Sequence, residues 1–325
     1  MKYPMIIAAL LATGPGLAMP AVARAEPVAM AVKEAVTDEL AEGEISDFAD
    51  GSQMVGADYF TVYIEGEGPD VLLIPGLSTP RAVWDKTREQ LKDRFRVHTI
   101  QTRGFGDKAP TETLAPEGRS LLDSYAFHLA DYIDDYVIRI SGGQSPAIIG
   151  HSMGGLVAMK IALNMGHQVD RIMVIDRLPF DGLFRPDSSE DIVKPQAAVM
   201  REELAAQDSG EPDERRLQEM SALAAGREQV RIWGQSADPK VVAAYFHDVM
   251  TTDMSGALDN INLPMTILYP FDATRMRKEE VDALYRGVFA KARTAKFGRI
   301  DASRRFIMLD QPEKFAEAVE RFLSQ

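Results

Sequence analysis

A serine with a glycine two residues away on each side follows an apolar run, in Gly150-His151-Ser152-Met153-Gly154. The apolar residues before it predict a buried strand and the residues after it a helix, so Ser152 is expected at a tight strand-to-helix turn. Glycines let the backbone pass closely at such a turn. A serine presented there is a candidate nucleophile that needs a neighbouring base to take its proton. A simple helix-capping serine is the alternative interpretation.

Strands and helices alternate on both sides of this turn. Short apolar or β-branched runs predict strands, and longer segments with apolar residues at helical spacing predict helices. This alternation indicates an α/β fold with a doubly wound, mostly parallel sheet. The predicted strands cover residues 60–64, 71–74, 95–100, 147–149, 172–175, 265–269 and 296–300, and the predicted helices cover 81–92, 121–138, 153–165, 278–292 and 312–323.

The alternation stops between residues 181 and 260, where the pattern is acidic and mostly helical. We interpret this segment as a helical cap inserted into a core formed by residues 58–180 and 261–325. Its predicted helices cover residues 195–206, 213–225 and 239–250. Several large apolar residues suggest an adaptable lining for a fairly apolar substrate, although core packing would explain them equally well: Met200, Met220, Trp233, Met250 and Met254.

The N-terminal residues have the pattern of a cleaved signal peptide. Lys2 precedes an apolar run, and small residues lead to Ala23-Arg24-Ala25, so residues 1–25 are expected to be removed on export. An uncleaved membrane anchor is the alternative, but the apolar run is short for a membrane span. Residues 26–57 are expected to form a partly ordered lead-in with one short helix. The mature protein would therefore be periplasmic or secreted, with no stable membrane span.

Charge and composition exclude several functions. The net charge of −13 becomes −15 when Lys2 and Arg24 leave with the signal, which argues against nucleic acid or an anionic membrane as a partner. The absence of cysteine removes disulfide and thiolate chemistry. Histidine spacing supports no metal site, and no glycine-rich loop supports a nucleotide cofactor. We therefore expect no metal and no cofactor; the sequence does not indicate the oligomeric state.

From about Tyr59 to Gln325 the chain resembles the α/β-hydrolase superfamily, in particular capped serine esterases and lipase-like hydrolases. The resemblance implies that Ser152 is the nucleophile and that the backbone N–H groups of Met153 and Leu77 form the oxyanion hole. It also implies that Asp272 orients the catalytic histidine, with Asp176 as the rival acid. The stretches that carry the resemblance are residues 72–77, 150–155, 268–272 and 306–312.

The catalytic histidine is missing from its expected place. The resemblance puts the base directly before Phe306, where this sequence has Arg305. An arginine stays protonated and cannot take a proton from serine, and beside Asp272 it would form an ion pair. The last histidine in the chain, His247, lies in a predicted cap helix and is the least implausible substitute base. The others are expected to be structural: His98, His128, His151 and His167.

Two functions follow from this pattern. The first is a serine hydrolase that acts on an ester-like small molecule through an acyl-serine intermediate, with turnover impaired by Arg305. The second is a non-catalytic binding protein that uses the same pocket. Loss of turnover in this chain, substitution of a histidine in an active parent, and recruitment of another histidine all remain open at this stage. Neither the acyl group nor the leaving group follows from the sequence.

Overall fold

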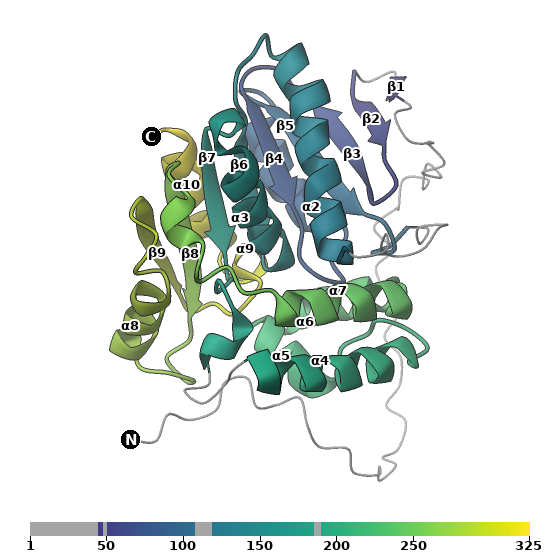
Figure 1. Ribbon diagram of the computed structural model, residues 1–325, viewed down its shortest axis with the longest axis vertical. Coiled ribbons are helices and arrows are strands. Elements are labelled where there is room, and N and C mark those ends of the chain that lie inside the picture. The colour runs from purple at the N-terminus through teal and green to yellow at the C-terminus, as the bar shows by residue number, and fades with distance from the viewer. Residues whose placement is uncertain (1–44, 48–50, 108–118, 185–189) are drawn as a thin grey trace.

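A nine-stranded sheet forms the centre of the structure, a computed structural model that describes residues 45–47, 51–107, 119–184 and 190–325 (Figure 1). The strand order is β1-β2-β3-β5-β4-β6-β7-β8-β9; β1 to β3 are antiparallel, and all pairs from β5 to β9 are parallel. This confirms the predicted α/β class and its mostly parallel sheet. The strands are β1 Ile45–Asp47, β2 Gln53–Gly56, β3 Phe60–Glu65, β4 Asp70–Ile74, β5 Arg96–Thr102, β6 Ala147–His151, β7 Arg171–Ile175, β8 Met265–Phe271 and β9 Ala295–Asp301.

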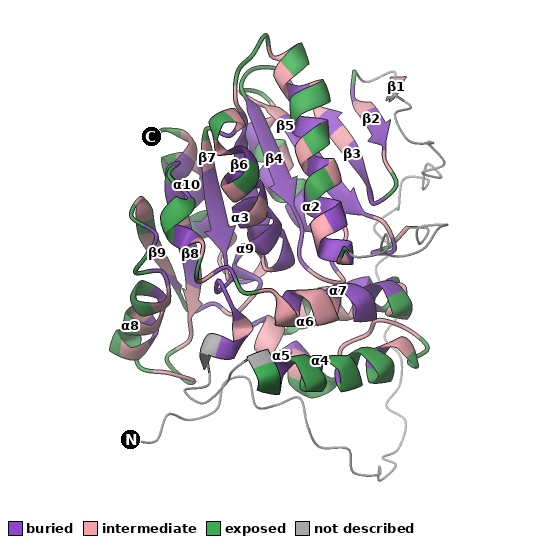
Figure 2. Ribbon diagram, in the orientation of Figure 1, coloured by how far each residue is buried: buried purple, intermediate pink, exposed green. Residues whose placement is uncertain are grey.

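Helices cover both faces of the sheet, which explains why its central strands are continuous apolar runs (Figures 1 and 2). In β4, Leu72 and Ile74 face one buried cluster while Val71 and Leu73 face another. The first cluster receives α2 (Leu121–Tyr132), α3 (Met153–Met165) and α8 (Lys278–Val288). The second cluster receives α1 (Asp85–Leu91) and α10 (Pro312–Leu323).

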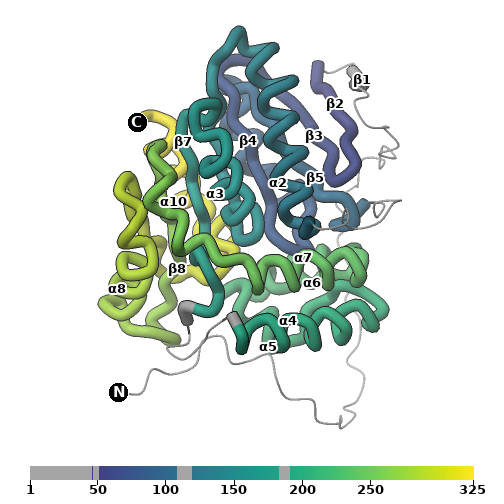
Figure 3. Tube along the Cα trace, in the orientation of Figure 1, coloured from purple at the N-terminus to yellow at the C-terminus, as the bar shows by residue number. Residues whose placement is uncertain are grey.

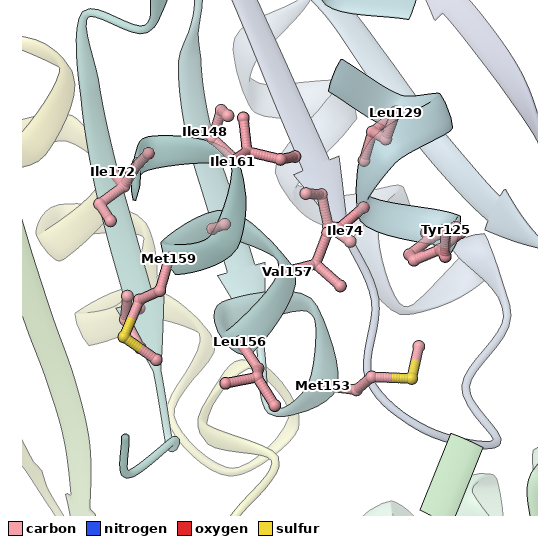
Figure 4. Packing of buried hydrophobic residues seen from close by; sticks show 14 of the residues in the cluster. Ile74, Tyr125, Leu129, Ile148, Met153, Leu156, Val157, Met159, Ile161 and Ile172 are labelled. Carbon is pink, nitrogen blue, oxygen red and sulfur yellow. The ribbon is translucent and has the colours of Figure 1, made fainter. Parts of the chain in front are cut away.

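Helix α3 is held against the middle of the sheet, as its central place in the chain trace also shows (Figure 3). Its side chains Leu156, Val157 and Ile161 are buried and pack with Ile74 and Ile148 of the strands beneath (Figure 4). Burying a side chain of this size contributes about 1.5 to 3 kcal/mol. The N-terminus of α3, directly after Ser152, is therefore fixed by a well-packed core.

One local prediction needs correction, and one segment contains strands that the sequence does not predict. The helix predicted over residues 121–138 is α-helical only to Tyr132 and continues as a π-helical turn over Ile133–Ile138. The short helix expected in the 26–57 lead-in is not found in its described residues, 45–47 and 51–57. Here β1 and β2 pair antiparallel at the edge of the sheet, which the sequence does not predict. Backbone pairing of Gln53–Gly56 with β3 explains this, since it does not require a strong apolar pattern. The predicted signal peptide, residues 1–25, lies outside the described residues, as do residues 26–44 and much of the loop after Gly104.

In chain order, the α-helices α4 to α7 come between β7 and β8. In space they run beside one end of the sheet (Figure 1). The predicted 213–225 helix is wrong in its boundary: α5 ends at Met220, and a separate helix α6 follows. The backbone is extended at Ser221, and the hydroxyl of Ser221 donates a hydrogen bond to the carboxylate of Asp310, a residue of the core. No helix among the described residues has the length and apolarity needed to cross a membrane. The four helices are α4 Glu190–Ala205, α5 Glu214–Met220, α6 Ala224–Gln235 and α7 Pro239–Thr251.

Candidate active site

Ser152 occupies the sharp turn between β6 and α3 that the sequence predicts. Its φ of 51° lies in the left-handed region, where a residue with a side chain is uncommon and strained. A Cβ on Gly150 would lie 2.2 Å from the carbonyl oxygen of Gly154, and one on Gly154 would lie 2.3 Å from that of Ile74. Only glycine fits these two positions, so the strained turn is built into the sequence around the serine.

The loop after β4 passes directly beside this turn. A Cβ on Gly76 would lie 3.0 Å from His151 Nδ1 and 3.2 Å from Ser152 Cβ. Leu77 follows in this loop and lines the same cavity as Ser152, while Met153 begins α3. The first N–H groups of a helix have no partner within the helix and attract negative charge. The two residues expected to form the oxyanion hole are thus brought to the serine from separate elements.

Arg305 stands at the position expected for the catalytic histidine. Its Nη2 lies 3.5 Å from Ser152 Oγ, and its Nε lies 3.1 Å from Oδ2 of Asp176. The guanidinium therefore bridges the serine and an acid, in the place where an imidazole would relay a proton. The negative charge of Asp176 raises the pKa of Arg305 above its ordinary value, so this arginine cannot act as a base.

The partner of Arg305 is Asp176, at the end of β7, and the expected pair with Asp272 is wrong. Both acids follow neighbouring strands, so their sequence positions do not decide which one reaches residue 305. Asp272 instead accepts a hydrogen bond of 2.8 Å from Arg304 Nε and two further bonds from Thr274. These bonds lower the pKa of Asp272, although its partial burial opposes them. Asp272 is thus tied to the neighbouring arginine.

Asp176 is a buried acid whose carboxylate has few partners to offset the loss of water. Only 11% of its side chain is exposed, and its Oδ2 has an ion pair with Arg305 but no well-aligned hydrogen bond. Its Oδ1 accepts a long hydrogen bond, 3.4 Å, from the hydroxyl of Tyr285. Burial raises the pKa of Asp176 from 3.8 to about 6, and the positive charge of Arg305 reverses this only in part.

The raised pKa of Asp176 predicts a pH-dependent cost to stability. The folded protein binds the proton of the Asp176 carboxyl more tightly than the unfolded chain does. Protonation of Asp176 therefore stabilises the folded state fully below about pH 4, and this stabilisation is lost as the pH rises through 6. Over that window wild type should lose about 3 kcal/mol of unfolding free energy relative to Asp176→Asn. Urea unfolding of both proteins from pH 4 to 7.5 measures the difference. The buried His151, whose pKa is lowered to about 4, titrates in both and cancels; a constant difference would contradict the shift.

Two arginines beside Asp272 connect the core to helix α5. Arg304 and Arg275 both donate to the carbonyl oxygen of Gln218, and Arg275 also pairs with Glu219. Because Asp272 lies 2.8 Å from Arg304 and 3.9 Å from Arg275, it holds both cations in place. The acid favoured from sequence therefore supports a contact between the sheet and the inserted helices.

The loop that carries Arg305 is held at several points. Asp310 accepts a hydrogen bond from the backbone N–H of Arg304, and Phe306 N–H donates to the carbonyl of Met220. His151 Nε2 lies 2.9 Å from the carbonyl oxygen of Arg305, and its buried ring packs on Phe306. This geometry requires the proton on Nε2, so the imidazole donates to the loop. The ring of His151 packs as the sequence predicts, but its hydrogen bond to the loop of Arg305 has no signal in the sequence.

The other histidines have contacts of their own. His98 is fully buried between Asp70 Oδ1 and the hydroxyl of Tyr132, each at 2.7 Å. His128 packs on Tyr59, and His167 lies in a short 3₁₀ turn after α3. His247 contacts Asp248 at 3.3 Å and is not among the described residues that line the cavity. Within the described residues, His151 is the histidine that lines the cavity.

A cavity of about 340 Å³ opens over Ser152 between the sheet and the inserted helices. Its size is at the lower end of ligand pockets, about 300 to 1,000 Å³. Met220 and Met250 line it, as suggested from sequence, whereas Met200, Trp233 and Met254 are buried elsewhere in the packing. The fold and the strained serine that lines the cavity define an α/β-hydrolase type of architecture.

Comparison with known proteins establishes the family. The sequence profile of the alpha/beta hydrolase family matches residues 71–318, and the chain belongs to this family. Pimeloyl-[acyl-carrier protein] methyl ester esterase of Vibrio campbellii is 26% identical over 215 residues, which cover 63% of this chain and 76% of that protein. The family assignment confirms the resemblance found in the sequence, and esterases are among the relatives.

Solved structures support the same fold. A hydrolase from Pseudomonas aeruginosa PA01 superimposes with a TM-score of 0.65 at 18% identity, covering 87% of this chain and 98% of that one. A thermophilic esterase from Thermogutta terrifontis gives a TM-score of 0.64 at 23% identity, covering 85% and 95%. At these identities the likeness concerns the fold alone.

Proposed function

We propose that this chain is a serine hydrolase of the alpha/beta hydrolase family that accepts an ester-like small molecule and turns it over slowly through an acyl-serine intermediate. The observation that carries this proposal is the position of Arg305, which contacts both Ser152 and Asp176. The architecture supports binding and nucleophilic attack, while the arginine blocks the proton relay. The similarity to the methyl ester esterase of Vibrio campbellii supports an ester as the substrate class.

The remaining catalytic power is expected to come from binding and the oxyanion hole. In serine enzymes, loss of a triad member leaves roughly 10³ to 10⁴-fold acceleration over water. Here Leu77 and Met153 are proposed to donate the two oxyanion hydrogen bonds, since both lie beside the turn that carries Ser152. Residues 181–260 are proposed to act as a cap that shields the ester from water. We also propose export to the periplasm or outside the cell, on the basis of residues 1–25.

A second function is supported by the same contact. Because Arg305 pairs with Asp176 directly above the serine, the pocket could serve a non-catalytic binding protein that retains the family's cavity. The two functions differ in the reactivity of the Ser152 hydroxyl. A hydrolase needs at least weak activation of that oxygen, whereas a binding protein needs none.

Replacement of Ser152 separates these functions. Wild type is expected to hydrolyse p-nitrophenyl butyrate slowly and to be labelled by a fluorophosphonate, and Ser152→Ala should lose both. Labelling is followed by intact mass spectrometry, and Ser78→Ala serves as a control for a neighbouring serine that also lines the cavity. Hydrolysis that persists in Ser152→Ala would assign the activity to another group. A wild type that neither reacts nor turns over would support the binding protein.

A further inference from the structure

The arginines that line the cavity differ in how many partners their guanidinium groups have. Of its arginines, Arg177 pairs with Asp181 and donates to the carbonyl of Val249. Arg275 and Arg304 are committed to helix α5 and Asp272, as described above. Arg216 and Arg305 have fewer contacts: the side chain of Arg216 has an ion pair with Asp213 at 3.8 Å, and that of Arg305 has one ion pair and one long hydrogen bond within the described residues. Arg305 differs from Arg216 because its hydrogen bond reaches Ser152.

Arg305 has side-chain N–H groups without a recorded partner among the described residues, and its side chain is partly exposed in the cavity. A guanidinium carries five N–H groups, and the contacts with Asp176 and Ser152 involve Nε and Nη2. The Nη1 group and the second N–H of Nη2 have no recorded partner among the described residues. Since 38% of the side chain is exposed and Arg305 lines the cavity, these donors are available to a ligand there. Such a pair of parallel donors matches the two oxygens of a carboxylate.

Other groups near these donors also favour a negative oxygen. The hydroxyl of Ser152 lies on the same side of the cavity, 3.5 Å from Arg305 Nη2. Helix α3, thirteen residues long, begins at Met153 and directs the positive end of its dipole toward the same place. The negative charge of Asp176 lies at the Nε edge of the guanidinium, and its ion pair with Arg305 offsets part of that charge.

Helices α4 and α7 contribute an apolar part of the cavity lining, while Glu211, Arg216 and Glu219 line it from the segment between them. The apolar part consists of Leu204 of α4 and Val242, Phe246, Val249 and Met250 of α7. These side chains would surround a short hydrocarbon chain without offering it any hydrogen bond. A ligand that complements both Arg305 and this apolar part is amphipathic, with one charged end at Ser152 and an aliphatic body under the inserted helices.

We infer that this cavity binds a short- to medium-chain aliphatic carboxylic acid, with its carboxylate between the Arg305 guanidinium and the Ser152 hydroxyl. The inference rests on the proposed location of the functional site at Ser152 but does not require turnover. An uncharged ester would leave the free donors of Arg305 without an ionic partner, whereas an acid satisfies them. The arginine at position 305 thus favours an anion over an uncharged ligand of the same chain length.

Calorimetric titration with straight-chain acids from butyrate to decanoate tests this inference. We expect at least one acid to bind, and the amide of the same chain length to bind at least about tenfold more weakly. Arg305→Met should weaken binding of the acid by at least about tenfold and leave binding of the amide unchanged. Arg305→Lys should weaken binding of the acid by an intermediate factor, because lysine keeps the positive charge but lacks the paired N–H donors of a guanidinium. Arg139→Met removes an exposed arginine that is not among the described residues lining the cavity, and as a control it should change the acid's affinity less than about twofold.

The outcomes separate this inference from the proposed function. Equal affinity for acid and amide, no binding of any acid in the series, or full acid affinity in Arg305→Met would overturn it. Fluorophosphonate labelling of Ser152 in the same samples reports on the hydrolase proposal independently. Circular dichroism of each variant shows that it is folded, and retained amide affinity shows that the cavity is intact.

Discussion

Arg305→His is expected to raise the hydrolysis of p-nitrophenyl butyrate by at least about 10²-fold over wild type. A histidine at this position would lie between Ser152 and Asp176, where the arginine now contacts both. It could take the proton of the serine hydroxyl and return it to the leaving group. General acid–base catalysis of this kind raises the rate by about 10² to 10⁴-fold. The measurement is kcat/KM at pH 7.5 to 8, where a histidine is mostly neutral.

The control for this gain is Arg304→His, at the adjacent position. Arg304 pairs with Asp272 and with helix α5 and has no recorded contact with Ser152, so its replacement should produce no gain. The serine must also carry the new activity, so Arg305→His combined with Ser152→Ala should return to the background rate. If Arg305→His is folded and gains less than about 10², residue 305 does not occupy the position of the base.

In the Arg305→His background, Asp176→Asn is expected to remove most of the gained activity, a fall of about 10² or more. Asparagine cannot stabilise the imidazolium and favours the wrong tautomer, and in a serine protease this change costs about 10⁴ in kcat. The reason for choosing Asp176 is geometric: its carboxylate lies 3.1 Å from Nε of residue 305, whereas Asp272 is bonded to Arg304.

Asp272→Asn in the same background is the matched comparison. It should change kcat/KM by less than about threefold, while a fall in melting temperature is expected because Asp272 holds Arg304 and Arg275 against α5. Assays well below the melting transition keep these effects apart. The reverse ranking, with Asp272→Asn abolishing the gain and Asp176→Asn having little effect, would identify Asp272 as the orienting acid.

Local sequence determined the fold class and the place of the serine. Continuous apolar runs such as Leu72-Leu73-Ile74 predict strands buried on both faces, and their alternation with helices predicts a parallel sheet. Gly150 is required by a backbone contact within the turn and Gly154 by the backbone of Ile74 in β4, and their spacing around Ser152 identifies the turn in the sequence. The absence of histidine at position 305 is likewise a property of the sequence and needs no structure.

The tertiary structure decided what the sequence left open. Asp176 and Asp272 both follow parallel strands, and the competition of two adjacent arginines for two acids is settled by side-chain packing around the cavity. The edge hairpin of β1 and β2 also escaped prediction, because backbone pairing with β3 places it there. Sequence spacing reports which residues reach the same edge of the sheet, but only the packed side chains determine that Arg305 contacts both Ser152 and Asp176.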